Sequence, residues 1–188
     1  MIARKLVLLA LAALFSAATT QLQGQALPTA TRTGILQAGF GVSNASTDEF
    51  TSSGSRISGI TGYVTFDIRG HIGIEADIHM LSIITPNDFA ESSYLLGARY
   101  VWHRRHLDPY VKVLGGIGRT SIQQPSQTYV PGTPGTYMAI AAAGGLDIRL
   151  SHHINVRAIE FEYQKWPNFP PNGLNPSVIT CGAAYRFN

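Results

Sequence analysis

The residue types best suited to chemistry are the imidazole of His79 and the hydroxyl of Ser82, three positions apart. A histidine that takes the proton of a serine hydroxyl is the usual arrangement for nucleophilic catalysis. The surrounding residues alternate between apolar and polar, which predicts a β-strand, and positions i and i+3 of a strand face opposite sides. Without a bulge the two side chains cannot meet, so the sequence predicts no catalytic residue.

The remaining histidines lie near the ends of predicted strands: His71, His103, His106, His152 and His153. Clustered imidazoles bind transition metals or respond to pH near neutrality. The spacings match no dedicated metal site, so we expect no metal ligands and no cofactor. The run HRRH at 103–106 would alternatively suit contact with anionic headgroups or with assembly factors, and the competing interpretation is that it has no role.

Three glycines in VKVLGGIGRT, residues 111–120, superficially suggest a phosphate-binding loop. Such a loop leads into a helix, whereas these glycines lie in a strand pattern. Close packing of backbone, or a bend, explains them better.

The element that carries His79 is HIGIEADIHM, residues 71–80, whose apolar and polar residues alternate strictly. A strand of this kind has one apolar and one charged face. In a water-soluble sandwich or lipocalin the apolar face lines the core, and in a membrane barrel it meets lipid. The rest of the chain decides between these two classes.

The N-terminal residues predict export. Arg4 and Lys5 precede an apolar run from Leu6 to about Phe15, which is typical of a signal peptide and too short to span a membrane. We predict a signal peptide over 1–26, with cleavage after Ala18 as an alternative, and one domain over 27–188. An uncleaved N-terminal anchor is the competing interpretation.

The composition limits the classes of partner and of cross-link. Without Arg4 and Lys5, 12 of the 14 basic residues remain against 11 acidic ones, which gives no reason to expect nucleic-acid binding. Cys181 is the single cysteine, so an intramolecular disulfide is excluded. Abundant glycine and the lack of helix-period segments after the leader favour an all-β chain.

Period-two alternation predicts eight strands: 34–43, 57–68, 71–82, 92–102, 109–118, 137–150, 153–164 and 177–187. The connections after the odd-numbered strands are longer than those after the even-numbered ones. Three of the long connections, 44–56, 119–136 and 165–176, are polar or rich in proline and read as surface loops. Short turns at one end and long loops at the other are typical of a transmembrane barrel.

One face of the strands carries no charged residue. A charge that faces the bilayer midplane costs about 2–4 kcal/mol, so lipid would demand this absence. The seventh strand changes parity between Val156 and Phe161, and a β-bulge near Ala158-Ile159 would restore a single apolar face.

The other face predicts a charge network inside the barrel. An eight-stranded barrel has room only for its own side chains, so buried charges there must pair. The predicted members are Asp67, Glu75, Asp77, Arg99, Lys112, Asp147, Arg149, Arg157, Glu160, Glu162 and Arg186.

Aromatic residues on the apolar face gather near the strand ends, as expected of two girdles at the membrane interfaces. One predicted girdle holds Phe66, Tyr100, Trp102, Tyr185 and Phe187, and the other holds Tyr94, Phe161, Tyr163 and Trp166.

With its leader, its eight alternating strands and the closing AAYRFN (183–188), the chain resembles the OmpA/OmpX-type family of small outer-membrane barrels over about residues 34–188. The resemblance implies an all-β, eight-stranded, antiparallel up-and-down transmembrane β-barrel with periplasmic termini. It also implies that the assembly machinery reads the final strand, where Tyr185 and Phe187 match the family pattern and Asn188, in last position, does not.

Four functions remain open. The favoured one is a structural or surface-interaction protein with a plugged interior, whose four extracellular loops meet a ligand while its outside contacts outer-membrane lipid and lipopolysaccharide. A narrow channel, a lipid-A-modifying enzyme and a soluble lipocalin-like carrier are the alternatives.

Overall fold

The computed structural model describes residues 34–46, 56–81, 83–84, 89–122, 135–170 and 172–187. The predicted signal peptide (1–26) and Ser82 lie outside the described residues. No helix long and apolar enough to cross a membrane occurs among the residues that the structure describes.

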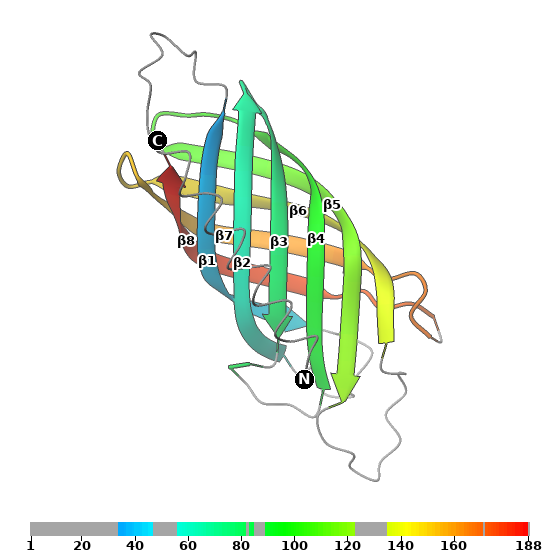
Figure 1. Ribbon diagram of the computed structural model, residues 1–188. Coiled ribbons are helices and arrows are strands. Elements are labelled where there is room, and N and C mark those ends of the chain that lie inside the picture. Colours follow the sequence, from blue (N-terminus) through cyan, green and yellow to red (C-terminus); the bar gives the residue numbers. More distant parts are fainter. Residues whose placement is uncertain are drawn as a thin grey trace, which may run out of the picture. The chain divides into compact units, whose positions relative to one another are not determined.

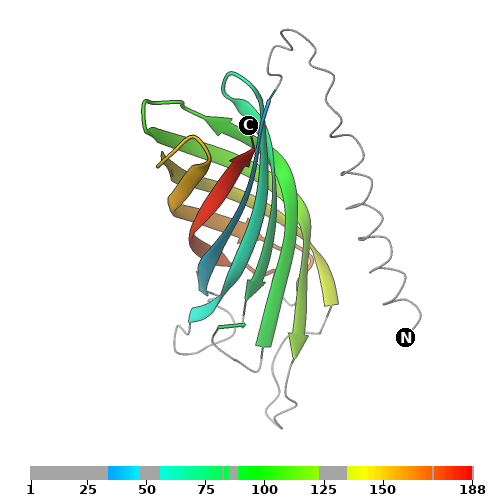
Figure 2. The same ribbon diagram turned by 60° about the vertical axis from the view of Figure 1, so that its left-hand side comes forward.

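Eight antiparallel strands close into a barrel, in which each strand pairs with its neighbours in sequence and β1 pairs with β8 (Figures 1 and 2). The strands are β1 (Ile35–Ser46), β2 (Arg56–Arg69), β3 (Ile72–Leu81), β4 (Phe89–Val101), β5 (Leu107–Ile122), β6 (Gly135–Arg149), β7 (Ile154–Lys165) and β8 (Ser177–Phe187). The predicted eight-stranded up-and-down barrel is therefore confirmed.

The two ends of the barrel differ. β1 begins and β8 ends at one end, called here the terminal end, where Leu36 pairs with Phe187. β2, β4 and β6 also end there, and β1, β3, β5 and β7 end at the opposite end, called here the loop end (Figure 1). The predicted alternation of short and long connections is confirmed.

The strand that contains HIGIEADIHM shows how the two faces are assigned. The side chain of Ile74 is 45% exposed on the outside, whereas that of Glu75 is 0% exposed inside the barrel. Because successive residues of a strand alternate in direction, the same division runs along β3 as a whole. The isoleucines face outward and the carboxylates inward.

The seventh strand contains the predicted bulge. The register of β7 with β8 shifts between Arg157 and Glu160, and its register with β6 shifts at the same place. The extra residue keeps Asn155 and Arg157 inside before the bulge and Glu160 inside after it.

The connection between β7 and β8 differs from the surface loop that we predicted. Trp166 and Leu174 pair through both backbone amides and extend the ladder, and Gly173 makes the return with φ of +89°. Trp166, Phe169 and Leu174, together called the lid, are at most 2% exposed and pack on Leu95, Leu114, Ala139 and Ala141.

Trp166 is therefore not part of an outer girdle. Tyr163 faces outward, and because side chains alternate, Trp166 three positions later faces inward. The ring of Trp166 lies so close to Gly118 that a Cβ at position 118 would overlap it. The prediction was wrong because it read Trp166 as a loop residue near the interface and did not continue the parity of β7.

Candidate functional site

The interior of the barrel carries the chemistry of this molecule. All Asp and Glu side chains among the described residues are buried: Asp67, Glu75, Asp77, Glu91, Asp108, Asp147, Glu160 and Glu162. Charged groups so removed from water are stable only when they are paired.

Glu75 on β3 is the hub of the centre. Its carboxylate accepts from Arg99 on β4 (Nη1 to Oε2, 2.7 Å) and from Lys112 on β5 (Nζ to Oε1, 2.8 Å). Arg157 on β7 also reaches it, with 2.9 Å between Nη1 and Oε1. One carboxylate thus ties three strands to β3.

Further acids complete this central network. Asp147 on β6 pairs with Arg99 (Nη2 to Oδ2, 2.5 Å) and with Arg157 (Nε to Oδ1, 3.3 Å). Glu160 lies 2.8 Å from the ammonium of Lys112 and 3.0 Å from Arg157.

Two tyrosines enclose the guanidinium groups. The Arg157 guanidinium lies 3.7 Å from the ring centroid of Tyr63, and that of Arg99 lies 4.0 Å from the centroid of Tyr110. Tyr110 also donates its hydroxyl to Glu160 at 2.5 Å. Cation–π contact in a dry interior adds to the pairing of charges, so Arg99 and Arg157 each have both acid and aromatic neighbours.

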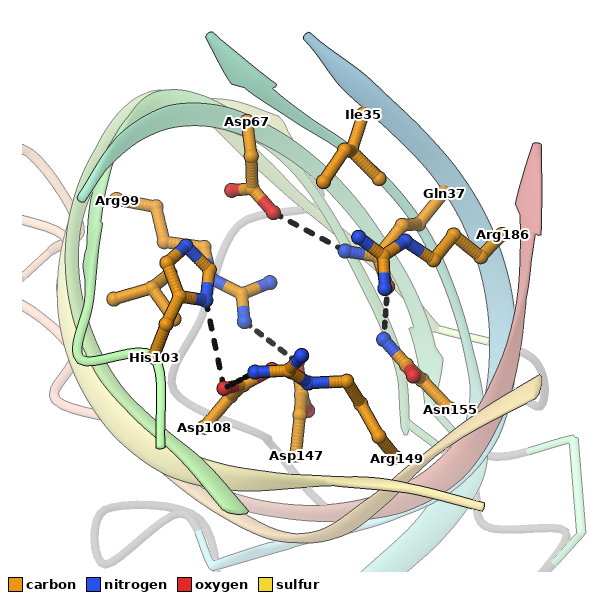
Figure 3. A pocket seen from close by; sticks show the side chains of 11 residues that line it. Ile35, Gln37, Asp67, Arg99, His103, Asp108, Asp147, Arg149, Asn155 and Arg186 are labelled. Atoms are coloured by element: carbon orange, nitrogen blue, oxygen red, sulfur yellow. Dashed lines mark hydrogen bonds and ion pairs between the residues drawn. The ribbon is translucent and has the colours of Figure 1, made fainter. Parts of the chain in front are cut away.

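At the terminal end, largely polar side chains line a pocket, called here the mouth (Figure 3). Asp108 accepts two hydrogen bonds from Arg149, 2.6 and 2.7 Å long, and lies 3.4 Å from His103. Arg186 also lines this mouth.

A second chain of hydrogen bonds crosses the mouth. Gln37 donates to Asp67 at 3.2 Å and accepts from Asn155 at 2.5 Å. Asp67, Arg149 and Arg186 line this mouth together with Arg99 and Asp147 of the central network.

Towards the loop end the interior is polar on one side and apolar on the other. His79 lies 3.3 Å from Glu162, and Gln164 donates to Glu162 at 2.8 Å while accepting from the indole of Trp166 at 2.9 Å. Asp77 contacts Lys112. The lid covers these polar groups from the loop end.

Several interior groups were missed by sequence reasoning. Asp108 and Glu91 were assigned to connections, but β5 starts at Leu107 and β4 starts at Phe89, so both side chains fall on inward positions. The alternation of inward and outward residues continues before the predicted starts of these two strands, and this was the signal that could have placed both acids inside. The pairing of Gln37 with Asn155 could not be seen, since it depends on the closure of β1 against β8.

The other predicted girdle residues lie on the outside with 39% to 51% of each side chain exposed: Phe66, Tyr94, Tyr100, Trp102, Phe161, Tyr163, Tyr185 and Phe187. At the terminal end Tyr100 meets Trp102 edge to face at 4.9 Å, and Tyr185 meets Phe187 at 5.1 Å.

Two of the turn histidines contact aromatic residues of the terminal end. His71 stacks on Tyr100 and His103, and His153 stacks on Tyr185.

Comparison with known proteins agrees with this architecture. The model of the outer membrane protein beta-barrel domain family matches residues 7–187. Comparison with curated protein sequences finds no match.

Solved structures share the barrel. Neisserial surface protein A is 14% identical, with 82% of this chain and 97% of that chain covered and a TM-score of 0.58. Ail, the attachment invasion locus protein of Yersinia pestis, in complex with the heparin analogue sucrose octasulfate, is 14% identical, with 82% and 99% covered and a TM-score of 0.56. OprG from Pseudomonas aeruginosa is 12% identical, with 82% and 96% covered and a TM-score of 0.58. At these identities the likeness establishes the fold.

Proposed function

The chain belongs to the outer membrane protein beta-barrel domain family, and from this premise we propose that it is a closed outer-membrane scaffold with a surface-interaction role. The terminal end faces the periplasm and the loop end faces the outside. Four connections at the loop end are then available to extracellular molecules. No catalytic residue is needed for this role.

The ion pairs buried inside the barrel are the observation that carries the proposal. The central network joins β3, β4, β5, β6 and β7 through ion pairs, and the lid packs over its loop end. An ion that crossed the barrel would have to separate buried pairs, which is costly. The interior therefore favours a scaffold over a pore.

Conductance tests this proposal. The refolded protein is inserted into planar lipid bilayers, and its closed barrel is verified by a mobility in SDS that changes on boiling. We expect no current steps above the bare bilayer. Reproducible steps from barrels that pass the mobility check would contradict the scaffold and favour the narrow channel.

Charge at the loop end supports contact with lipopolysaccharide. Arg56, Arg119 and Lys165 are exposed near the loop-end termini of their strands, whereas the described acids are all buried. Cationic side chains at this level suit the phosphate groups of outer-leaflet lipid.

Purified lipopolysaccharide provides the test of this contact. Its addition should raise the temperature at which the barrel loses its SDS-resistant form. Replacing Arg119 and Lys165 by Gln should reduce this stabilisation. The matched variant with Arg104 and Arg105 replaced by Gln, at the terminal end, should keep it, and equal losses in both variants would refute the contact.

The enzyme alternative has a weaker basis. His79 is 0% exposed inside the barrel, out of reach of a lipid substrate. Unchanged lipid A masses in cells that overproduce the protein are the expected result.

At the C-terminal end of the chain, Tyr185 and Phe187 are exposed on β8 and suit recognition by the assembly machinery.

A further inference from the structure

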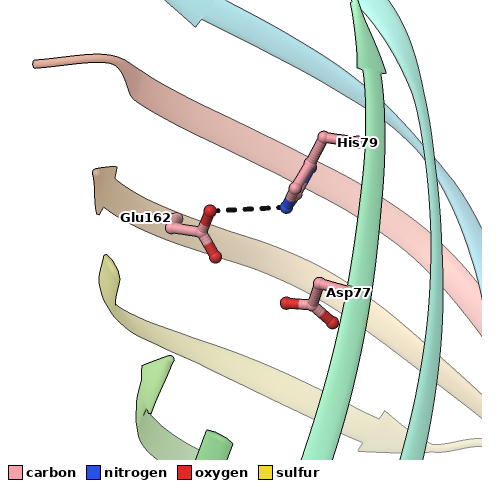
Figure 4. A group of neighbouring side chains, drawn as sticks. All are labelled: Asp77, His79 and Glu162. Carbon is pink, nitrogen blue, oxygen red and sulfur yellow. Dashed lines mark ion pairs between the residues drawn. The ribbon is translucent and has the colours of Figure 1, made fainter. Parts of the chain in front are cut away.

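Three potential metal ligands meet inside the loop-end half of the barrel: Asp77 and His79 of β3 and Glu162 of β7 (Figure 4). One ligand atom from each lies within 4.8 Å of the others. None of the three side chains is more than 1% exposed. β3 and β7 are not neighbours in the sheet, so closure of the barrel creates this group.

Atoms of these side chains that could ligate a metal ion lack hydrogen-bond partners. Asp77 Oδ1 and Glu162 Oε2 have no hydrogen-bond partner among the described residues. His79 Nε2 makes no hydrogen bond there either and lies 3.3 Å from Glu162 Oε1. Buried polar atoms are normally satisfied, so carboxylate oxygens of two neighbouring acids that lack a hydrogen-bond partner call for an explanation.

The imidazole is held in the orientation that a ligand needs. His79 Nδ1 lies 2.8 Å from the hydroxyl of Thr61, which leaves Nε2 directed at Glu162. Thr61 is itself hydrogen-bonded to Ser43. Histidines that bind metals usually have their second nitrogen fixed by a hydrogen bond of this kind.

Glu91 independently indicates that this part of the interior favours a cation. It is 0% exposed, and neither of its carboxylate oxygens has a hydrogen-bond partner among the described residues. It lies on the inner face of β4, two positions from Ser93, the register partner of His79. It is close enough to interact electrostatically with His79.

The local charges do not balance. Asp77, Glu91 and Glu162 share only His79 and Lys112 among the described cationic side chains. The ammonium of Lys112 lies 2.8 Å from both Glu75 and Glu160 of the central network and 3.9 Å from Glu162. A surplus of buried negative charge favours the uptake of a cation.

We propose that Asp77, His79 and Glu162 bind one divalent transition-metal ion of the Zn²⁺ type inside the barrel, with Glu91 adding negative charge beside it. An imidazole nitrogen with carboxylate oxygens suits Zn²⁺ and its neighbours, whereas Ca²⁺ and Mg²⁺ require more oxygen ligands. The site is independent of the surface role proposed above.

Metal content of the refolded barrel is the direct test. The protein is refolded with Zn²⁺ in detergent, freed of unbound metal by gel filtration, and analysed by atomic emission. We expect one Zn²⁺ per barrel. His79→Gln and Glu162→Gln should each lower the affinity at least about 100-fold, since even outer-shell changes cost 10- to 100-fold.

The control addresses binding by surface histidines. His106→Gln makes the same substitution at an exposed position in the terminal-end turn and should retain the ion. Bound Zn²⁺ that is retained in the His79→Gln variant and lost in the His106→Gln variant would overturn the proposal. Wild-type barrels that elute without Zn²⁺ would overturn it as well.

A second measurement keeps the three proposed metal ligands unchanged, so it does not depend on the folding of a variant at these positions. The chain has two tryptophans, and Trp166 is linked to Glu162 through Gln164. In a Trp102→Phe background, Co²⁺ or Cu²⁺ in the site should quench the fluorescence of Trp166, and excess Zn²⁺ should reverse the quenching. Fluorescence that does not respond to either metal would contradict a site below the lid.

Discussion

At the scale of single residues, Glu75 has the largest role in the interior. Three cations from three strands depend on its carboxylate. Removing one partner of a buried ion pair costs more than the pair itself contributes, because the remaining charges lose their compensation. Substitutions at this position should therefore affect the whole barrel.

Glu75→Gln keeps the shape of the side chain and removes its charge. We expect a loss of about 3–5 kcal/mol in the free energy of unfolding, measured by urea titration in detergent. Asp108→Asn is the matched change at the terminal mouth, where the side chain of Arg149 is 28% exposed, and it should cost less. Equal losses would refute the central role of Glu75.

Lys112 should compete with a metal ion in the proposed site. Its ammonium contacts Asp77 and lies 3.9 Å from Glu162. Lys112→Gln removes this positive charge, and because like charges repel strongly at this range, Zn²⁺ affinity should rise about tenfold or more. Titration of the refolded variant against a competing chelator measures the change, and a weaker affinity would contradict the proposed geometry.

At the scale of elements, the lid depends on a glycine of a distant strand. An added Cβ at Gly118 of β5 would overlap the ring of Trp166, whereas one at Gly115 would meet nothing within 4 Å. The glycines of VKVLGGIGRT thus serve close packing, and the one at 118 makes room for the lid.

Gly118→Ala should displace Trp166 from its position. Overpacking of this kind typically costs about 1–3 kcal/mol, and in a Trp102→Phe background the emission should shift to the red as the indole meets water. Gly115→Ala, the same substitution on the outward face, should leave the spectrum unchanged. Identical spectra for the two variants would count against this packing.

The bulge of β7 is the second feature at this scale. Because the bulge adds one residue between Arg157 and Glu160, removal of that residue would leave a regular alternation with both side chains inside. Deletion of Ala158 should therefore retain the SDS-resistant barrel. Deletion of Phe161, which lies outside the bulge, reverses every position on one side of the deletion and should abolish this form. A Phe161 deletion that still resists SDS, or a loss of the barrel on deletion of Ala158, would contradict this account of the bulge.

At the scale of the whole molecule, charge is separated by sign. The described acids lie inside, whereas exposed basic residues lie at both ends, with Arg56, Arg119 and Lys165 at the loop end and Arg104 and Arg105 at the terminal end. The outer wall between them is apolar. This distribution suits a membrane whose headgroups are anionic on both sides.

Much of this arrangement could be predicted from alternation alone. The division between Ile74 outside and Glu75 inside, the eight strands and the bulge at Ala158-Ile159 all follow from a period of two and the high cost of a charge in lipid. These are local properties, so each strand reveals its own faces without reference to the others.

Which interior residues meet was decided only by the closed barrel. Trp166 contacts Gly118, and Glu162 contacts His79, and in each case the two residues belong to segments that are not consecutive in the chain. Their meeting depends on the stagger of strands around the barrel, to which every register contributes. The sequence by itself determined the fold and the inward set of charges, whereas the tertiary structure decided the partners, because a contact across the lumen is a property of all eight strands together.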